Sequence, residues 1–363
     1  MFGIVKAEKL LVKYKNKSIG LLMNQASFIQ DGFVFTLDYL RSLGFNIRKV
    51  LAPQHGLFPI TQANMIPFYS YYDNIFKIEV VSLYEEGYSF DKQKLEDLDV
   101  VFIDIQDIGA RYYTYVWTSM LICETGIEVV IFDRPNPLGN KKEGIILKKE
   151  FFSFVGMKNI YNRHGMTIGQ ILGDYENVRV IEGDFDKSKD WYELGLKWIP
   201  TSPNIPSIES VYFYPGFALL EATNISEGRG TTYPFEVFGA PFINEEKLKK
   251  RIEYYKHKYS IQGVEFIYHR FVPTFDKYKG QVCNGLKMII TNYKTFSPIK
   301  TFLIVLKSLV DLHPTELRFN DPPYEYEYTR MPIDILWGDD SLRKNIYSER
   351  GFDCLLEMVS TDG

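Results

Sequence analysis

The stretch Asp99–Thr114, DVVFIDIQDIGARYYT, carries the clearest signal for the fold. Its residues 100–103 are continuously apolar, as in a strand of a parallel sheet that helices cover on both faces. Polar residues follow, and then a helical pattern that Gly126 ends. We therefore predict a buried strand over residues 99–105 and a helix over residues 110–125.

Similar apolar runs recur on either side of this stretch. Residues 18–24, 46–51, 78–83 and 128–132 have the patterns of strands, and residues 34–43 and 92–98 have the patterns of helices. Strands that alternate with helices through short connections indicate an α/β fold with a parallel, doubly wound sheet.

The second half of the chain differs in composition. Residues 201–241 are rich in Pro, Gly, Asn, Ser and Thr, which predicts long ordered loops. Beyond them we expect a charged amphipathic helix over residues 245–259, strands over 263–270 and 285–291, and a helix over 300–312. We predict an N-terminal domain over residues 1–241 and a smaller α+β C-terminal domain over residues 242–363.

Charge and hydropathy argue against several classes of protein. The chain has 42 Lys and Arg against 46 Asp and Glu, so the basic surface of a nucleic-acid protein is not expected. No stretch approaches the roughly 20 apolar residues of a membrane span. The first residues, MFGIVKAEKLLVKYKNKS, lack the long apolar core of a signal peptide. We expect a cytoplasmic protein with no nucleic-acid and no membrane partner.

Common metal and cofactor motifs do not occur in the sequence. The cysteines Cys123, Cys283 and Cys354 form no CxxC, and the five histidines form no HExxH, so no metal site is expected. No GxGxxG follows the first expected strand, and neither a P-loop motif nor a GxSxG motif is present. We therefore expect no cofactor and no serine-triad chemistry.

Polar side chains collect where the expected strands end. In an open parallel sheet, ligands bind beyond the carboxyl ends of the strands, so residues there are expected to line one cleft. The residues at these ends are Asn24, Gln54, His55, Asp104, Gln106, Asp107, Arg111, Asp133, Arg134 and Asn136.

Two carboxylates, Asp104 and Asp107, follow the strand over residues 99–105. A pair of carboxyls in different environments is what glycoside hydrolysis needs, and Tyr113 could offer a ring to a sugar at the same place. The alternative is structural: Asp107 caps the following helix, and Asp104 pairs with Arg111 or Arg134. The sequence leaves both interpretations open.

Further candidates lie in the middle of the chain. His164 precedes a helix that Thr167 is expected to cap, and it is either a substrate ligand or part of that cap. Asn204 lies between two prolines in a turn. The segment LLEATNISEGRG gathers Glu221, Asn224, Glu227 and Arg229, which suits hydroxyl and amide recognition but also a loop that satisfies itself.

Over nearly its whole length the chain resembles the NamZ-type exo-β-N-acetylmuramidase family, formerly a domain family of unknown function. The resemblance rests on long ordered matches: GLLMNQ (20–25), PQHG (53–56), FIDIQDIGARYYT (102–114), DRPNPLG (133–139), RHGMT (163–167), SPNIP (202–206) and EATNISEGRGTT (221–232). It implies a Rossmann-like N-terminal domain, a smaller C-terminal domain and a cleft between them. It also implies release of terminal N-acetylmuramic acid from peptidoglycan fragments without a cofactor, as in cell wall recycling.

One position departs from the family pattern. The family's usual Pro-Glu-His-Gly carries a glutamate, and this chain has Gln54 there, which cannot exchange a proton as a general acid or base. We therefore expect catalysis by a carboxylate among Asp104, Asp107, Glu221 and Glu227, with His55 and His164 orienting the sugar. An arginine among Arg111, Arg134 and Arg229 is expected to bind the lactyl carboxylate of the muramyl sugar. The alternative is a non-catalytic protein that binds a sugar or a cell-wall fragment on a glycosidase scaffold.

Overall fold

The computed structural model describes residues 2–54, 56–58, 62, 68–84 and 90–359, and it divides into two compact units. The first unit comprises Met1–Gly109, Tyr113–Asn140 and Gly165–Pro203. The second comprises Ala110–Tyr112, Lys141–His164 and Asn204–Gly363. The chain therefore passes between the units several times rather than completing one before the other.

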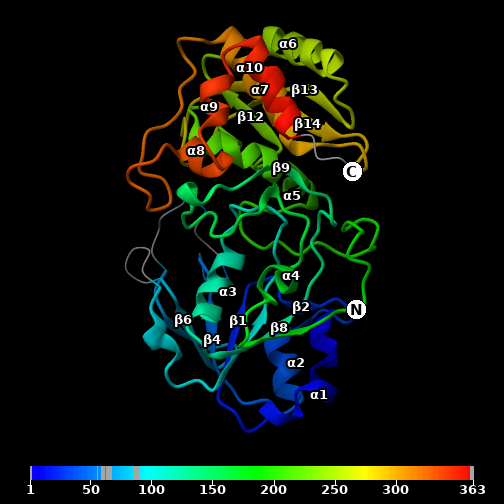
Figure 1. Cartoon of the computed structure of the whole chain (residues 1–363), viewed down its shortest axis with the longest axis vertical. Coiled ribbons are helices and arrows are strands. Elements are labelled where there is room, and N and C mark those ends of the chain that lie inside the picture. Colours follow the sequence, from blue (N-terminus) through cyan, green and yellow to red (C-terminus); the bar gives the residue numbers. More distant parts are fainter. Residues whose placement is uncertain (1, 55, 59–61, 63–67, 85–89, 360–363) are drawn as a thin grey trace. The chain divides into compact units, whose positions relative to one another are not determined.

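A seven-stranded sheet, counted over the described residues, forms the centre of the first unit (Figure 1). Its order is β11-β8-β7-β1-β4-β6-β5, and all neighbouring strands are parallel except β5, which pairs antiparallel with β6. The bounds are β1 (Ile19–Met23), β4 (Ile47–Ala52), β5 (Tyr71–Asp73), β6 (Ile78–Ser82), β7 (Val100–Asp104), β8 (Glu128–Phe132) and β11 (Val178–Ile181). A short ribbon, β2 (Phe28–Ile29) with β3 (Val34–Phe35), follows β1.

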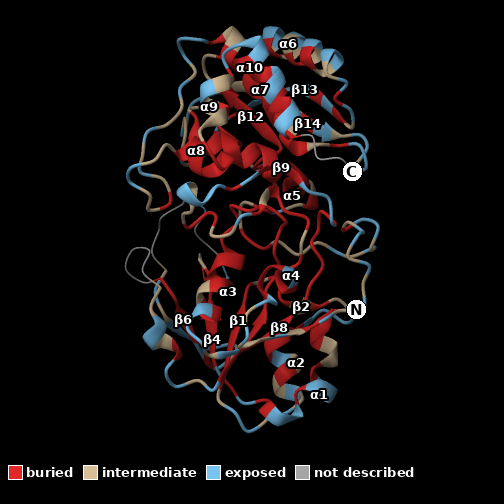
Figure 2. Ribbon diagram, viewed as in Figure 1, coloured by how far each residue is buried: buried red, intermediate tan, exposed pale blue. Residues whose placement is uncertain are grey.

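The sheet is doubly covered, as its sequence predicts. Every residue of β1 and β7 is buried, and Figure 2 shows β1, β4 and β8 as largely buried strands. The helix α2 (Thr36–Ser42) packs against β4, and α3 (Tyr115–Glu124) and α4 (Ile168–Leu172) pack against β8. Short helical turns complete this unit: η1 (Gly3–Lys6), α1 (Ala7–Leu10), η2 (Val12–Tyr14) and η3 (Lys92–Leu95). The predicted α/β fold with a mostly parallel sheet is confirmed.

The helix after β7 begins later than the sequence pattern predicts. We expected residues 110–125, but α3 starts at Tyr115. The Arg111 amide donates to the Asn162 carbonyl at 2.8 Å, and Ala110 bridges to Arg163. Pairing with a distant segment thus takes the backbone groups that a first helical turn would have used.

The second unit is built on a three-stranded antiparallel sheet, counted among the residues described, in the order β12-β14-β13. Its strands are β12 (Val237–Ala240), β13 (Val264–Phe271) and β14 (Cys283–Ile290), and a separate ribbon pairs β9 (Glu143–Ile146) with β10 (Tyr161–Arg163). The helices are α5 (Ile208–Phe217), α6 (Glu245–Lys258), α7 (Pro298–Leu312), α8 (Pro332–Trp337), α9 (Ser341–Asn345) and α10 (Glu349–Met358), with the turns η4 (Lys149–Phe151) and η5 (Ala218–Ala222). In the described part of the chain, no helix has the length and apolar character needed to cross a membrane.

The division between the units differs from the expected boundary after residue 241. Residues 204–241 belong to the second unit because β12 pairs with β14 and α5 packs on α7. The contact of the two helices depends on Gly216, since a Cβ at that position would lie 2.2 Å from the Pro298 carbonyl oxygen. The change in composition at residue 201 therefore lies close to the start of this segment at Asn204, and the boundary predicted after residue 241 does not.

A buried guanidinium holds the second unit together. Arg111 is fully buried, and burial lowers its pKa to about 10. Its guanidinium donates, at 2.7–3.2 Å, to the main-chain carbonyls of Ile145, Ile160, Leu336 and Trp337. Two of these carbonyls end α8, where a positive charge is favoured. Arg111 therefore joins three segments that are far apart in the sequence.

We predict that Arg111→Lys destabilises the protein, because an ammonium cannot reach this set of carbonyls. Each buried carbonyl left without a donor costs about 1–3 kcal/mol. The matched control is Arg343→Lys, which alters a more exposed arginine of the same unit that pairs with Asp334. Urea unfolding followed by circular dichroism should show a lower midpoint for Arg111→Lys alone, and equal midpoints would contradict this role.

Candidate active site

At the carboxyl end of β7, Asp104 forms a bidentate ion pair with Arg134. Arg134 Nε lies 2.6 Å from Asp104 Oδ1 and Arg134 Nη2 lies 2.8 Å from Oδ2, and both side chains are almost fully buried. The Thr36 hydroxyl also donates to Asp104, and Arg134 donates to the Phe28 carbonyl at 3.0 Å. Of the two arginines considered as partners, Arg134 is the one that pairs. This carboxylate therefore joins β7, β8, β2 and α2.

Asp133, the next strand-end carboxylate, organises the start of α4. Its Oδ1 accepts from the Gly169 amide and its Oδ2 from the Thr167 hydroxyl, both at 2.9 Å. Burial raises the pKa of Asp133, although these donors act against the shift. Thr167 caps α4 in a capping box with Gln170, as the sequence suggested for that residue.

The amides at the strand ends connect neighbouring loops. Asn24 Nδ2 donates to the Gln106 carbonyl at 3.2 Å, and Asn136 Nδ2 donates to the Met166 carbonyl at 3.0 Å. Gln106 Nε2 donates to the carbonyls of Asp107 and Pro135 at 2.8 and 3.1 Å. Its Oε1 is buried and accepts no hydrogen bond among the described residues. An unpaired buried acceptor is costly, so Gln106 is the strand-end amide best suited to receive a ligand donor.

Three other predicted residues of the first unit make local contacts. Asp107 Oδ2 accepts from the Gly109 amide at 2.8 Å, so this carboxylate closes the turn after β7 rather than capping α3. Gln54 Oε1 accepts from the Thr114 hydroxyl at 2.8 Å. The Tyr113 hydroxyl donates to Thr201 at 2.8 Å and its ring is buried, so it is not an open sugar platform. His55 lies outside the described residues.

The second unit holds a buried charged cluster in the segment around EATNISEGRG. Arg229 Nη2 lies 2.6 Å from Glu221 Oε1, and Arg229 Nε lies 3.7 Å from Glu227 Oε1. Lys277 Nζ donates to Glu227 Oε2 at 2.9 Å. The two glutamates and the arginine are all buried. The two carboxylates thus share one guanidinium.

The two carboxyls of this cluster are shifted in opposite directions. Burial raises the pKa of Glu221, with the Arg229 charge acting against it. Burial also acts to raise the pKa of Glu227, but the charges of Lys277 and Arg229 outweigh it and leave the pKa lowered. Opposite shifts in neighbouring carboxyls are the usual basis for separate proton-donor and carboxylate roles. As pH falls, Glu221 therefore takes up its proton before Glu227 does.

Sequence reasoning missed three residues of this cluster: Lys277, Tyr324 and Glu325. The Tyr324 hydroxyl donates to Glu221 Oε2 at 2.7 Å. Glu325 is buried and lies in a tight turn in which Tyr324 bridges to Glu327. Both central residues have positive φ, 43° for Glu325 and 64° for Tyr326, which non-glycine residues adopt at a cost of about 1–3 kcal/mol. The only available signal was the Pro322-Pro323 pair, which indicates a turn but not its partner.

The remaining predicted residues belong to the second unit. Asn224 ties its loop to residues 316–318, because Nδ2 donates to the Glu316 carbonyl at 2.8 Å and Oδ1 accepts from the Arg318 amide at 2.9 Å. His164 is buried directly after β10, and Asn204 is partly buried at the start of the unit's last segment. Within the described residues, no three His, Cys, Asp or Glu side chains gather as a metal ion would require.

Comparison with known families accounts for almost the whole chain. Residues 19–209 match the model of the N-terminal part of the exo-β-N-acetylmuramidase NamZ, and residues 212–362 match the model of its C-terminal part. The chain belongs to the NamZ family. The two family models meet at residues 210–211, close to where the second unit's last segment begins at Asn204.

Individual proteins similar to this chain agree with this assignment. The peptidoglycan β-N-acetylmuramidase NamZ of Bacillus subtilis strain 168 is 36% identical over 319 residues, which are 84% of this chain and 76% of that protein. A solved DUF1343 family protein of Bacteroides fragilis NCTC 9343 has a TM-score of 0.79 and 26% identity, and the match covers 100% of this chain and 98% of that one. A second solved DUF1343 family protein from the same organism has a TM-score of 0.66 and 23% identity, and the match covers 99% of this chain and 96% of that one. This second protein shares the fold.

We predict that Asp104→Asn lowers the free energy of unfolding by about 3–5 kcal/mol, because it leaves the Arg134 charge buried without its partner. The control is Asp174→Asn, which changes an exposed carboxylate of the same unit and should have little effect. Thermal and urea unfolding measure both variants. Equal free energies of unfolding for Asp104→Asn and the control would contradict a stabilising role of this ion pair.

Proposed function

We propose that this protein is an exo-acting glycoside hydrolase that releases terminal N-acetylmuramic acid from peptidoglycan fragments. The observation that carries the proposal is the match to both parts of the NamZ family model, which together span residues 19–362 with only two residues between them. The B. subtilis relative, a peptidoglycan β-N-acetylmuramidase, supports the substrate class.

For the chemistry we assign Glu221 as the proton donor and Glu227 as the ionised carboxylate. Glycoside hydrolysis needs a proton on the departing oxygen and a negative charge near the oxocarbenium-like carbon. Glu221 transfers its proton to the glycosidic oxygen as the C1–O bond breaks, and water then adds to C1 and returns a proton to the enzyme. Arg229 and Tyr324 hold the two oxygens of Glu221 in place, and Lys277 keeps Glu227 ionised.

The other candidate residues take binding or supporting roles in this proposal. We propose Gln106, through its buried Oε1, and His55 as sugar ligands of the first unit, and His164 as a sugar ligand of the second unit. Asp107 is a further carboxylate that we propose for catalysis, whereas Asp104 holds Arg134 in place. Arg111, Arg134 and Arg229 all make buried contacts within their own units. We propose Arg229 for the lactyl carboxylate because it lies in the same cluster as Glu221 and Glu227.

We also propose that the protein acts in the cytoplasm, on wall fragments that are being recycled. None of its three cysteines, all of which lie in the described residues, forms a disulfide, and Cys123 and Cys283 are buried whereas Cys354 is exposed. Free thiols persist in reducing compartments. Cell fractionation with an antibody to the chain tests this location directly.

We predict that Glu221→Gln lowers kcat on a chromogenic N-acetylmuraminide by about 10²- to 10⁴-fold, the usual contribution of a general acid. The wild-type rate should fall as pH rises through the raised pKa of Glu221, because the proton is then lost. It should also fall as pH drops through the lowered pKa of Glu227, because that carboxylate then becomes neutral. The residual activity of Glu221→Gln should lack the high-pH fall.

The matched control for this variant is Glu357→Gln, which alters an exposed glutamate of α10 in the same unit. It should leave both kcat and the pH profile unchanged. A Glu221→Gln enzyme that keeps the wild-type rate and profile would exclude Glu221 as the acid and turn attention to Asp107.

A substitution at Gln54 distinguishes the proposed hydrolase from the alternative, which is a sugar-binding protein without turnover. Because Gln54 Oε1 accepts from Thr114, a glutamate at this position could keep the same contact. We predict an active wild type that Gln54→Glu impairs, since a new negative charge at the strand ends raises the pKa of neighbouring carboxyls. Turnover of the chromogenic muraminide, with sugar binding measured by calorimetry, tests this. An inactive wild type that binds the sugar and gains turnover in Gln54→Glu would identify a binding protein instead.

A further inference from the structure

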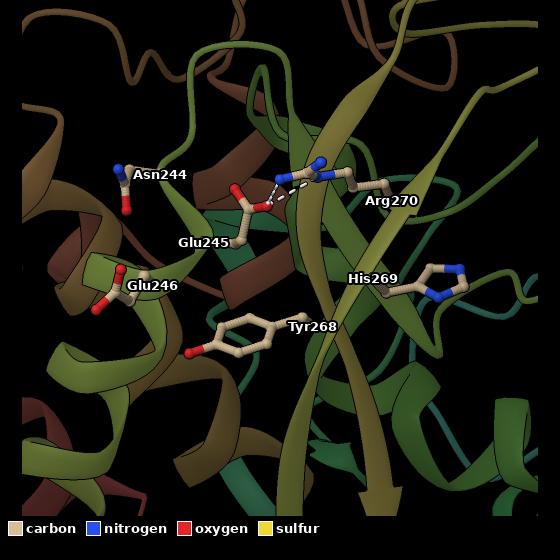
Figure 3. Close-up of a pocket in the computed structure, with 6 residues that line it drawn as sticks. All are labelled: Asn244, Glu245, Glu246, Tyr268, His269 and Arg270. Carbon is tan, nitrogen blue, oxygen red and sulfur yellow. Dashed lines mark hydrogen bonds and ion pairs between the residues drawn. The ribbon is translucent and has the colours of Figure 1, made fainter.

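A pocket of about 790 Å³ lies in the second unit between the start of α6 and the end of β13. None of its lining residues was considered as a site from the sequence. They are Asn244, Glu245, Glu246, Tyr268, His269 and Arg270, which Figure 3 shows around the hollow. The volume falls within the range of small-ligand sites, about 300–1,000 Å³.

The strand β13 gives the pocket an aromatic wall. It is an edge strand of its sheet, and successive side chains of a strand point to opposite faces. Figure 3 shows Tyr268 pointing toward α6 and His269 pointing to the other side of the strand. The Tyr268 ring is 55% exposed, which is high for a large ring. Lys249 Nζ lies 5.2 Å from the ring centroid and helps to hold it in place.

The polar groups of the pocket have hydrogen-bond partners but are not saturated. Arg270 Nε donates to Glu245 Oε1 at 2.8 Å, and Glu246 Oε1 accepts from Lys250 Nζ at 2.6 Å. Asn244 Oδ1 accepts from the Lys247 amide and so caps α6. A carboxylate has about four acceptor positions, so each glutamate retains capacity for hydroxyl donors.

We propose that this pocket is a second saccharide-binding site, which holds an amino-sugar ring of the glycan chain away from the bond that is cleaved. The inference rests on the proposed function for the identity of the glycan. An exposed ring provides an apolar face for the C–H side of a sugar, and carboxylates and an amide beside it accept from hydroxyl and N-acetyl N–H groups. Arg270 and Lys250 pair with Glu245 and Glu246, so the pocket suits a polar, weakly charged ligand better than a phosphate.

A second site on the same chain would act through local concentration. Once one part of a long glycan is held here, binding of its terminus becomes intramolecular and the apparent affinity for the polymer increases. A substrate of one sugar cannot use both sites and gains nothing. The two substrate sizes therefore separate the role of this pocket from catalysis.

The test compares Tyr268→Ala with Tyr254→Ala on two substrates. Tyr254 is the matched control, because it is also 55% exposed and lies on α6 but does not line the pocket. The substrates are a chromogenic N-acetylmuraminide and a soluble glycan strand of alternating N-acetylglucosamine and N-acetylmuramic acid. We expect Tyr268→Ala to raise KM for the strand by roughly threefold to tenfold, the effect of losing one aromatic contact. Its kcat, and both constants for the chromogenic substrate, should match the wild type.

Tyr268→Trp, which keeps an aromatic face, should retain the wild-type KM for the strand. Equal KM values for the strand in wild type, Tyr268→Ala and Tyr254→Ala would overturn the proposal, as would an equal rise in both alanine variants. If the wild type hydrolyses neither substrate, the proposed function fails, but calorimetry with the glycan strand still decides on the pocket. Weaker binding by Tyr268→Ala alone would then support the site, and equal binding by all variants would overturn it.

Discussion

The buried ion pair between Asp104 and Arg134 is the constraint on which the first unit depends. Two charges without water are costly unless their geometry is good and their remaining hydrogen-bonding capacity is used. Here the guanidinium grips both carboxylate oxygens, Thr36 donates to the same carboxylate, and Arg134 also reaches the Phe28 carbonyl. The end of β7 is thereby fixed to the segments after β8 and β1. The loops that carry Asn24, Gln106 and Asp107 start next to this ion pair.

In the second unit, a buried arginine is stabilised by carbonyl groups instead of a carboxylate. Arg111 is buried against four carbonyl groups, two of which end α8. Burial still lowers its pKa, to about 10, because carbonyl dipoles stabilise a cation less than a full negative charge does. In both units an arginine expected at a ligand site instead joins distant segments of the chain.

The charged cluster around Arg229 differs in its balance of charge from the Asp104–Arg134 ion pair and from the contacts of Arg111. Two buried carboxylates, Glu221 and Glu227, share one guanidinium, and Lys277 forms an ion pair with Glu227. Burial raises the pKa of Glu221, whereas the charges of Lys277 and Arg229 outweigh the effect of burial on Glu227 and leave its pKa lowered. The strained turn at Glu325 and Tyr326 brings Tyr324 to Glu221, and strain of this kind collects where function constrains the backbone. This asymmetry is the reason why we propose this cluster for the chemistry.

The sequence by itself determined the parallel sheet, its strands and the polar character of their ends. Strand burial is a local property, since a run such as VVFI in β7 suits a strand covered on both faces whatever lies elsewhere in the chain. The tertiary structure alone decided which charges pair, that α3 starts at Tyr115, and that residues 204–241 join the second unit. It also brought Tyr324 to Glu221, 103 residues away in the sequence. Partners so far apart leave no local periodicity, because their pairing follows from the packing of whole segments.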